Sequence, residues 1–287
     1  MKPALPRHWS KDLGPQWQML SIYSLLGLAL VLLLFPLYWM FLIATLHDDQ
    51  LLLYPPVFLP DRGLFLHPFA RIFVDRPLVQ WLLNSTYVAV LTTVISLGVS
   101  ALGGYSLSRI KTPESRVMGA MLLLVRMLPG TLLIVPLYIV FHRLHLIDNR
   151  VTLVIANTSY IIPFGVWMMK GFFDGIPKEI EESAQVDGCT IFGAFVRVTL
   201  ALSRPGLAAT AMYCFVFSWG ELLFARTLIN SGQKGTITAG VTTYIGDTTI
   251  SWNDMMAASL LACLPVLIIF LFLEKHLVRG LVAGSIK

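Results

Sequence analysis

Hydrophobic residues run through this chain in long blocks that are separated by short polar stretches. A helix rises about 1.5 Å per residue, so about 20 apolar residues cross a hydrocarbon layer of roughly 30 Å. Six blocks are long enough to do so. The pattern therefore predicts an all-α polytopic membrane protein with six transmembrane helices. We place these helices at residues 17–46, 84–108, 117–141, 151–169, 206–225 and 255–273.

The polar stretches divide the chain around these blocks. Residues 1–16 form a short N-terminal tail, and residues 47–83 form a loop in which a short helix is expected near residues 69–73. Residues 84–277 form a core of five helices, and residues 278–287 form a C-terminal tail. The first block is too long for the apolar core of a signal peptide, so we expect it to remain as a membrane anchor.

Two of the predicted spans contain residues that affect helix packing. The second span has Gly98, Gly103 and Gly104, which let another helix approach closely, as small residues do in membrane bundles. The third span contains Pro129 and Pro136, which interrupt helical hydrogen bonding. We therefore predict that the third span is not one straight helix.

The longest polar stretch within the five-helix core is residues 174–205, between the fourth and fifth spans. Pro177 suits the first position of one helix, and Gly188 supplies its stop in a left-handed conformation. Thr190 can cap a second helix, which ends near Pro205. The segment therefore reads as a helix-turn-helix elbow between two membrane spans.

The distribution of Lys and Arg residues orients the six spans. Six crossings place both termini on the same side, together with the elbow. That side carries thirteen Lys and Arg residues, the opposite side carries seven, and Arg126 lies within a span. Because positive residues accumulate in cytoplasmic loops, we expect the termini and the elbow to be cytoplasmic.

Composition narrows the functional classes further. Hydrophobic residues make up 56% of the chain and charged residues only 13%, so the net charge of +5 reflects cytoplasmic loops rather than nucleic-acid binding. Cys189, Cys214 and Cys263 are scattered, and His142 and His145 lack a third ligand at suitable spacing. No catalytic triad order or phosphate loop is present. We expect no metal, no cofactor and no enzymatic activity in this chain.

The elbow resembles the cytoplasmic signature of the membrane subunits of ABC importers. That signature reads Glu-Ala-Ala, three residues, Gly, nine residues, Ile, one residue, Leu-Pro. The corresponding residues here are Glu182, Ser183, Ala184, Gly188, Val198, Leu200 and Ala201. Ala201 replaces a helix-stopping Pro, so the second helix is expected to run on to about Pro205. The resemblance implies that the ATPase-coupling residues are Glu182, Ser183, Ala184, Asp187 and Gly188.

Flanking stretches resemble one branch of that family, the second membrane subunit of sugar importers of the maltose-permease type. The similarity covers about residues 69–287. It is carried by residues 84–85, 126–129, 136–138, 171–173, 176–177, 218–225 and 277–287. This branch usually has Trp-Asn-Glu in the fifth span, whereas the chain has Trp219, Gly220 and Glu221, which removes one amide from the expected sugar route.

The resemblance implies a permease subunit of an ATP-driven, binding-protein-dependent sugar importer, which forms half of the translocation path in a prokaryotic plasma membrane. Expected partners are a second homologous permease subunit, two cytoplasmic ATP-binding subunits, an extracytoplasmic sugar-binding protein, the carbohydrate and membrane lipid. ATP hydrolysis is expected on the separate ATPase subunits. Import of a polyol or glycerol phosphate by the same machinery, a secondary transporter and a structural anchor remain alternatives.

Three residues within the spans are candidates for the substrate path: Arg126, Trp219 and Glu221. A charge inside a span is costly and tends to face a cavity or a partner. Arg126 could instead reach a nearby interface or pair with Glu221 as a structural clasp. Trp219 could stack against a sugar ring or fill a helix interface. The sequence leaves these interpretations open.

Overall fold

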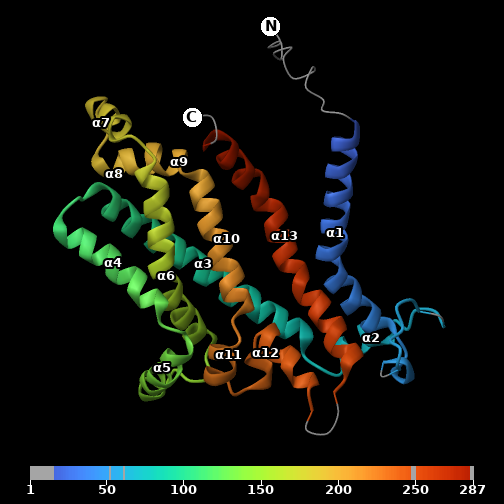
Figure 1. Ribbon diagram of the computed structural model, residues 1–287. Coiled ribbons are helices and arrows are strands. Elements are labelled where there is room, and N and C mark those ends of the chain that lie inside the picture. The colour runs from blue at the N-terminus through green and yellow to red at the C-terminus, as the bar shows by residue number, and fades with distance from the viewer. Residues whose placement is uncertain (1–15, 52, 61, 247–249, 285–287) are drawn as a thin grey trace.

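The computed structural model describes residues 16–51, 53–60, 62–246 and 250–284, with the backbone alone at 16–18 and 276–284. The predicted N-terminal tail therefore lies almost entirely outside the described residues. Every regular element in the described ranges is a helix (Figure 1). The all-α prediction is confirmed for this part of the chain.

Four described helices are long and apolar enough to cross a membrane on their own. In two further pairs, the helices are bent relative to each other at a short break. Counting each bent pair as one span gives up to six spans, and leaving the pairs out gives four. The number is compatible with the six predicted from the sequence. The four single helices are α1 (Gln16–Thr45), α3 (Leu78–Arg109), α6 (Arg150–Asp174) and α13 (Trp252–Gly284).

The first bent pair corresponds to the predicted third span. It consists of α4 (Pro113–Met127) and α5 (Thr131–Arg143), which meet at an angle of 97°. The break falls at Pro129, which has no N–H to continue the α4 hydrogen bonds, and the preceding Leu128 is already extended. The prediction that this span is not straight is confirmed.

The second bent pair joins the elbow to α10 (Arg204–Gly220), with an angle of 79° between them. The sequence placed the fifth span at residues 206–225, but α10 ends at Gly220. Glu221 is extended, and a separate short helix, α11 (Leu223–Leu228), follows. Glu221 therefore lies at a break between helices rather than inside one.

Two other predicted boundaries differ from the observed helix bounds. Helix α2 (His67–Val74) confirms the short helix in the first loop, but α3 begins at Leu78, so that loop ends before residue 83. Pro77 is the residue immediately before the first residue of α3. The predicted C-terminal tail is helical as far as Gly284, since no Pro interrupts α13 beyond Pro265. Residues 285–287 lie outside the described residues.

Helices α3, α6 and α10 pack against one another at the centre of the molecule, whereas α1 contacts α13 and α2. A Cβ at Gly104 would lie 2.7 Å from the backbone N of Lys170 and 2.8 Å from Cβ of Met169. The predicted close approach is thus confirmed at Gly104, and Gly103 faces α6 as well. At Gly98 a Cβ would meet no atom of the described residues within 4 Å, so the predicted close approach is not seen there within this chain.

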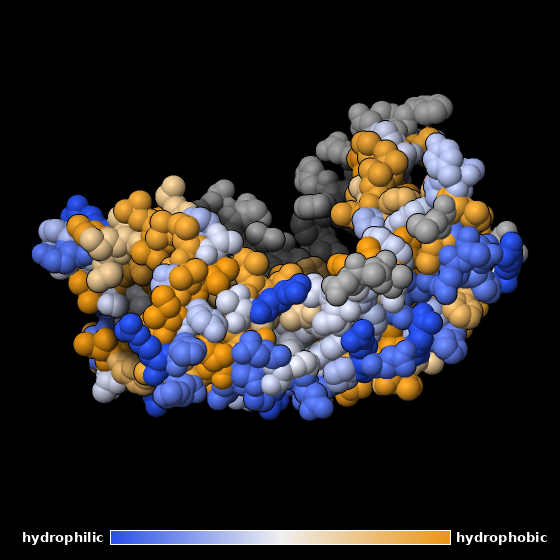
Figure 2. Space-filling model, turned by 90° about the horizontal axis from the view of Figure 1, so that it is seen from below, coloured by the Kyte–Doolittle hydropathy of each residue, from blue (hydrophilic) through white to orange (hydrophobic). Residues whose placement is uncertain are grey.

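The two ends of the molecule differ in their elements (Figure 1). Helix α7 (Lys178–Val186), the first residues of α1 and the last residues of α13 lie at one end. Helices α2, α5, α11 and α12 (Ile237–Val241) lie at the other. Figure 2 looks onto this second end and shows hydrophilic side chains spread over it with hydrophobic ones among them.

Asp148 holds together the connections at this second end. It has a left-handed backbone, with φ of 61°, and its carboxylate accepts N–H groups from Asn230 and Ser231 at 3.0 and 2.8 Å. The Lys234 ammonium lies 2.7 Å away. Burial raises the pKa of Asp148, but these hydrogen bonds outweigh it, so the pKa lies well below its ordinary value. The carboxylate therefore ties the α5–α6 connection to the segment after α11.

Candidate functional site

The first helix of the elbow, α7, ends in the turn that the sequence predicts. Gly188 is left-handed, with φ of +91°. Its N–H donates to the Gln185 carbonyl at 3.0 Å, and the Cys189 N–H donates to the Ala184 carbonyl at 3.0 Å. This pair of bonds is a Schellman motif, which requires a left-handed residue after the helix. The predicted stop at Gly188 is confirmed.

The second helix of the elbow starts with the predicted cap. Thr190 Oγ1 accepts the backbone N–H of Gly193 at 3.0 Å. The helix then runs as α8 (Ile191–Ala194), a π-helical turn at Phe195–Thr199 and α9 (Leu200–Leu202). It ends at Leu202, and Pro205 stands in the first turn of α10, where its missing N–H costs nothing. The expected extension toward Pro205 agrees with the structure.

An ionic clasp joins the elbow to the central helices, and the sequence reasoning missed it. Arg109, at the end of α3, donates through Nε to Glu181 Oε1 at 2.9 Å, and its Nη2 bonds the same oxygen. Tyr105 donates to the other carboxylate oxygen at 2.9 Å. Of the remaining guanidinium hydrogens, two reach the carbonyls of Phe173 and Ile176 at 3.1 and 3.3 Å, and one reaches Ser108 Oγ at 3.1 Å. One arginine thus binds α3, the end of α6 and α7 together.

The Glu181 carboxylate is charged in this setting. Only 4% of Glu181 is exposed. Burial raises the pKa of Glu181, but the hydrogen bonds from Arg109 and Tyr105 outweigh it and hold the pKa below the ordinary 4.5. The pair therefore contributes its full stability above about pH 4.5, and this contribution is lost as the pH falls through the lower native pKa.

The predicted coupling residues lie on the opposite, outer surface of the elbow. Exposed apolar side chains accompany them there; Val186, for example, is 87% exposed. Glu181 points toward α3, so the two adjacent glutamates, Glu181 and Glu182, serve different surfaces. The exposed residues of this outer surface are Glu182, Ser183, Val186, Asp187, Gly188, Ile191 and Phe192, and Ala184 is half-buried beside them.

Arg126 lies among aromatic rings rather than beside a carboxylate. Its guanidinium carbon is 4.3 Å from the ring centre of Tyr160 and 5.2 Å from that of Phe217. Phe164 and Tyr213 follow, each at 6.0 Å. Within the described ranges no carboxylate lies at ion-pair distance from Arg126. Cation–π contacts therefore replace a counter-charge at this position.

Glu221 caps a helix instead of pairing with Arg126. Its two carboxylate oxygens accept the backbone N–H groups of Phe224 at 2.7 Å and Ala225 at 3.0 Å, at the start of α11. The same residue lines a cavity of about 160 Å³ together with Tyr160 and Phe217. Arg126 and Glu221 thus lie around the same two rings without touching each other.

Trp219 fills a helix interface in this structure. It is 4% exposed, and its indole N–H donates to the Ala262 carbonyl of α13 at 3.0 Å. Its ring stacks on Phe215 at 5.6 Å. Of the two interpretations left open by the sequence, the structure shows packing against α13. Across the described part of the chain, no three His, Cys, Asp or Glu side chains gather as metal ligands would.

Residues 100–282 match the family described as binding-protein-dependent transport system inner membrane component. The chain belongs to this family. Its members are transport permeases rather than enzymes. The matched region begins within α3 and includes the elbow and the three candidate path residues, whereas α1 and α2 precede it.

Known permeases resemble the chain along most of its length. The inner membrane ABC transporter permease protein YcjP of Escherichia coli (strain K12) is 32% identical, over 93% of this chain and 96% of that protein. The diacetylchitobiose uptake system permease protein DasC of Streptomyces coelicolor is 33% identical, over 89% of this chain and 92% of that protein. A chain of the solved bacterial ABC transporter involved in the import of the acidic polysaccharide alginate has a TM-score of 0.76 at 20% identity, covering 93% and 99%. That likeness establishes the ABC permease fold.

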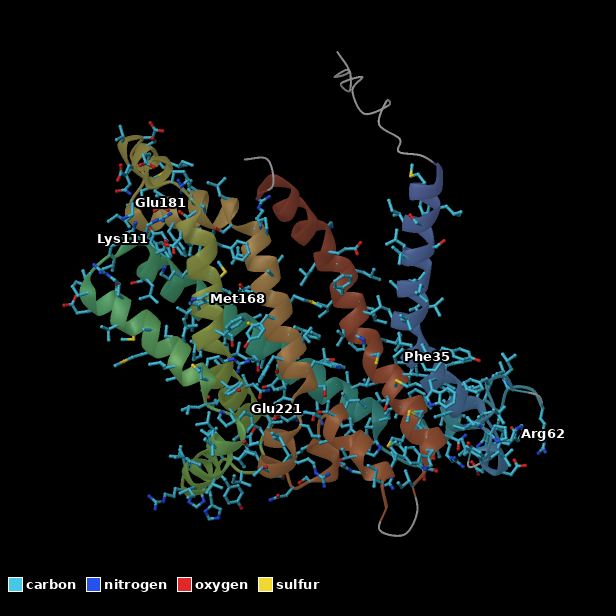
Figure 3. All side chains as sticks on the ribbon, in the orientation of Figure 1. Phe35, Arg62, Lys111, Met168, Glu181 and Glu221 are labelled. Atoms are coloured by element: carbon cyan, nitrogen blue, oxygen red, sulfur yellow. The ribbon has the colours of Figure 1, made fainter. Side chains whose placement is uncertain are left out.

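Within this permease, the structure separates the predicted site residues into two groups. The five predicted coupling residues lie in the elbow, at the end of the molecule where Figure 3 labels Glu181 and Lys111. Glu221 lies nearer the other end (Figure 3) and shares the rings of Tyr160 and Phe217 with Arg126, whereas the Trp219 indole binds α13. The Arg109–Glu181 pair could not be predicted from the sequence because the two residues are 72 positions apart.

Proposed function

We propose that the chain is a permease subunit of an ATP-driven, binding-protein-dependent importer of a carbohydrate. The printed functions of its relatives support this: DasC serves diacetylchitobiose uptake, and the alginate transporter imports a polysaccharide. The chain forms half of a translocation path with a second, homologous permease subunit. Two cytoplasmic ATPases hydrolyse ATP, and an extracytoplasmic binding protein delivers the sugar.

We propose six spans, with the bent pair α4–α5 counted as one and the fifth span at residues 206–225, after the elbow. Both tails, 1–16 and 278–287, and the elbow, 174–205, then lie in the cytoplasm of a prokaryotic cell. The helices of the five-helix core at 84–277 cross the membrane, and the loop at 47–83 lies outside. The excess of Lys and Arg at the elbow end supports this orientation.

The orientation predicts which engineered cysteines are accessible from outside the cell. In a variant whose native cysteines are replaced, Gln233→Cys should react with an impermeant thiol reagent in intact cells. Gln185→Cys should react only after the membrane is permeabilised, because the elbow lies on the cytoplasmic side. Both side chains are exposed in the structure, so a difference in labelling reports the side of the membrane. Labelling of Gln185→Cys in intact cells would place the elbow outside and contradict the proposal.

The observation that carries the proposed coupling is the two-sided elbow. Its inner surface is held to α3 and α6 through Arg109 and Glu181, and its outer surface presents the signature residues with exposed apolar side chains. An ATPase bound to the outer surface would move α7. The Arg109–Glu181 pair would transmit that movement to the central helices. The residues at the contact are Glu182, Ser183, Ala184, Asp187 and Gly188.

Gly188→Val should uncouple ATP hydrolysis from sugar uptake. A β-branched residue with φ of +91° costs about 1–2 kcal/mol and tilts the two elbow helices relative to each other. We expect normal insertion, retained ATPase activity and reduced uptake in proteoliposomes that contain the complete importer. Gly188→Asn is the matched control, because Asn tolerates a left-handed backbone and should retain most uptake. Equal uptake by both variants and the unmodified protein would remove the turn from the mechanism.

We further propose that Arg126 and Glu221 border the sugar path, with Tyr160 and Phe217 between them as the aromatic surface. Sugars are bound through hydrogen bonds to charged groups combined with contacts to an aromatic face. The cavity lined by Tyr160, Phe217 and Glu221 supports this arrangement. We keep Trp219 in this proposal in a supporting role. Its packing holds α10, which carries Phe217, against α13.

Arg126→Gln and Glu221→Gln should each lower uptake while the yield of assembled complex stays unchanged. Both replacements remove a charge but keep a polar side chain, which is of the same size only for Glu221→Gln. Trp219→Ala should behave differently and lower the yield, because emptying a buried aromatic site costs about 3–5 kcal/mol. Measuring yield beside uptake separates the effects. A loss of yield in the two Gln variants would indicate a structural role instead, and full uptake by both would discard this path.

A further inference from the structure

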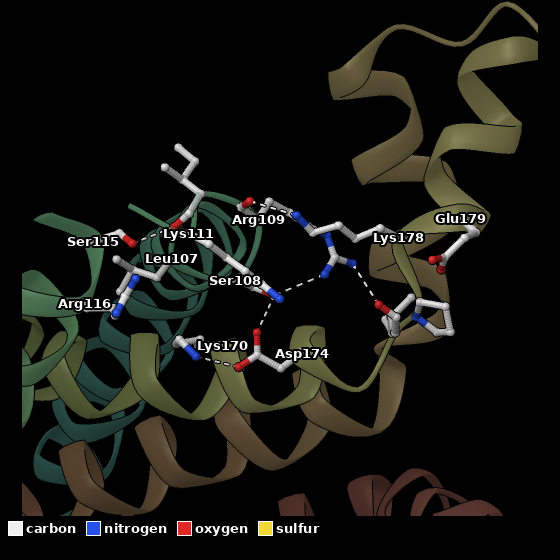
Figure 4. Close-up of a pocket in the computed structure, with 13 residues that line it drawn as sticks. Leu107, Ser108, Arg109, Lys111, Ser115, Arg116, Lys170, Asp174, Lys178 and Glu179 are labelled. Atoms are coloured by element: carbon white, nitrogen blue, oxygen red, sulfur yellow. Dashed lines mark hydrogen bonds and ion pairs between the residues drawn. The ribbon is translucent and has the colours of Figure 1, made fainter. Parts of the chain in front are cut away.

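A basic pocket lies where the end of α3, the start of α4, the end of α6 and the start of α7 meet (Figure 4). Its volume is about 660 Å³. Cationic side chains outnumber carboxylates among the residues that line it. The cations are Arg109, Lys111, Arg116, Lys170 and Lys178, and the carboxylates are Asp174 and Glu179.

Two of these cations already have a carboxylate partner. Arg109 is bound by Glu181, which lies behind the pocket wall. Lys170 lies 2.5 Å from Asp174, one turn along α6. Ser108 also donates to Asp174, at 2.7 Å, so this carboxylate is fully engaged. Neither pair leaves a free charge for a ligand.

Three cations remain to face the pocket. Lys178 donates to the backbone carbonyl of Arg109 at 3.1 Å, which leaves its charge uncompensated. Lys111 and Arg116 form no ion pair with any residue in the described ranges. Among the lining residues, the carboxylates near these three cations are Glu179 and the already paired Asp174, which also interacts electrostatically with Lys111. The pocket therefore has a net positive charge available for an anion.

The pocket lies at the boundary between apolar and polar parts of the molecule. The two apolar helices that form it, α3 and α6, end at Arg109 and Asp174. Its wall includes apolar side chains as well, among them Leu107 and Ile110. Exposed apolar residues follow directly along α4, with Val117 and Met121 at 55% and 56% exposure. A charged head with an apolar extension fits this arrangement better than a free anion does.

We infer that this pocket binds the phosphate group of an anionic phospholipid, with the acyl chains lying along α4. Basic pockets between membrane helices on the cytoplasmic side recognise such head groups, and the cytoplasmic leaflet is rich in them. The assignment of this lipid to the cytoplasmic leaflet rests on the proposed orientation of the chain. The chemistry of the pocket is independent of that orientation. The lipid would bridge Lys111 and Arg116 to Lys178 at the root of the elbow.

Native mass spectrometry of the delipidated, full-length chain with its copurifying subunits tests the assignment. Phosphatidylglycerol should bind at a saturable site, and phosphatidylcholine should not compete. Lys111→Gln/Arg116→Gln should weaken phosphatidylglycerol binding by about 30-fold, as expected for two lost lipid-facing cations. The matched control is Arg204→Gln/Lys275→Gln, which removes two exposed cations at the same end that do not line the pocket. It should bind as the unmodified protein does.

Three results would overturn the inference. The first is equal binding of phosphatidylcholine, and the second is equal weakening by the control variant, which would indicate surface charge alone. The third is displacement of the lipid by millimolar inorganic phosphate alone, which would make a free anion the ligand. Labelling of Gln185→Cys in intact cells would overturn the proposed orientation but would not affect the evidence for the phosphate pocket. Failure of the orientation and failure of the pocket assignment can therefore be distinguished.

Discussion

Replacing Arg109 by alanine is expected to release the elbow from the central helices and abolish ATP-driven uptake. The change leaves the Glu181 carboxylate buried and without its cation, and breaking one partner of such a pair costs about 3–5 kcal/mol. It also frees the carbonyls of Phe173 and Ile176. Hydrogen exchange of the α7 amides in the assembled complex should accelerate to the rate of a loop, while α13 stays protected.

Two further variants separate a lost ion pair from general damage. Arg109→Ala/Glu181→Ala should be less destabilised than Arg109→Ala alone, because no unpaired charge remains buried. Arg197→Ala removes an exposed arginine from the elbow and should leave exchange in α7 unchanged. Unchanged α7 exchange in Arg109→Ala would show that packing alone holds the elbow, and the clasp would then have no place in coupling.

The elbow turn was predictable from the sequence because its determinants are local. A left-handed glycine and a threonine cap act within a few residues, and both Gly188 and Thr190 perform the expected roles. The packing of the second span was predictable only in part. A glycine permits close approach but does not select a partner, so Gly104 meets α6 while Gly98 meets open space.

The surroundings of the charged residues could not be predicted, since they depend on how distant helices meet. The rings around Arg126 come from α6 and α10, and no local pattern indicates that they converge. Hydropathy predicts Glu221 within a span, yet its carboxylate accepts two backbone N–H groups at a helix break. The clasp was invisible for the same reason, although Arg109 ends a span and Glu181 stands beside the signature.

The contact between α3 and α6 gives the last prediction, in which two glycines of one helix respond oppositely to the same change. Gly104→Ala should lower stability by about 1–3 kcal/mol, because the added methyl group meets the backbone of Lys170 rather than a side chain that could turn away. Gly98→Ala should be neutral or raise stability by up to about 1 kcal/mol, since it adds helix propensity in open space.

Thermal unfolding of the purified protein in detergent measures both variants under one condition. Gly104 lies little more than one helical turn before Arg109, so separating α3 from α6 there should also loosen the clasp and increase exchange in α7. Gly98→Ala should leave α7 exchange unchanged. A Gly104→Ala protein that melts with the unmodified protein would mean that α3 and α6 do not approach as closely as the structure has them. The Arg109–Glu181 pair would then be the main contact that holds the elbow to the central helices.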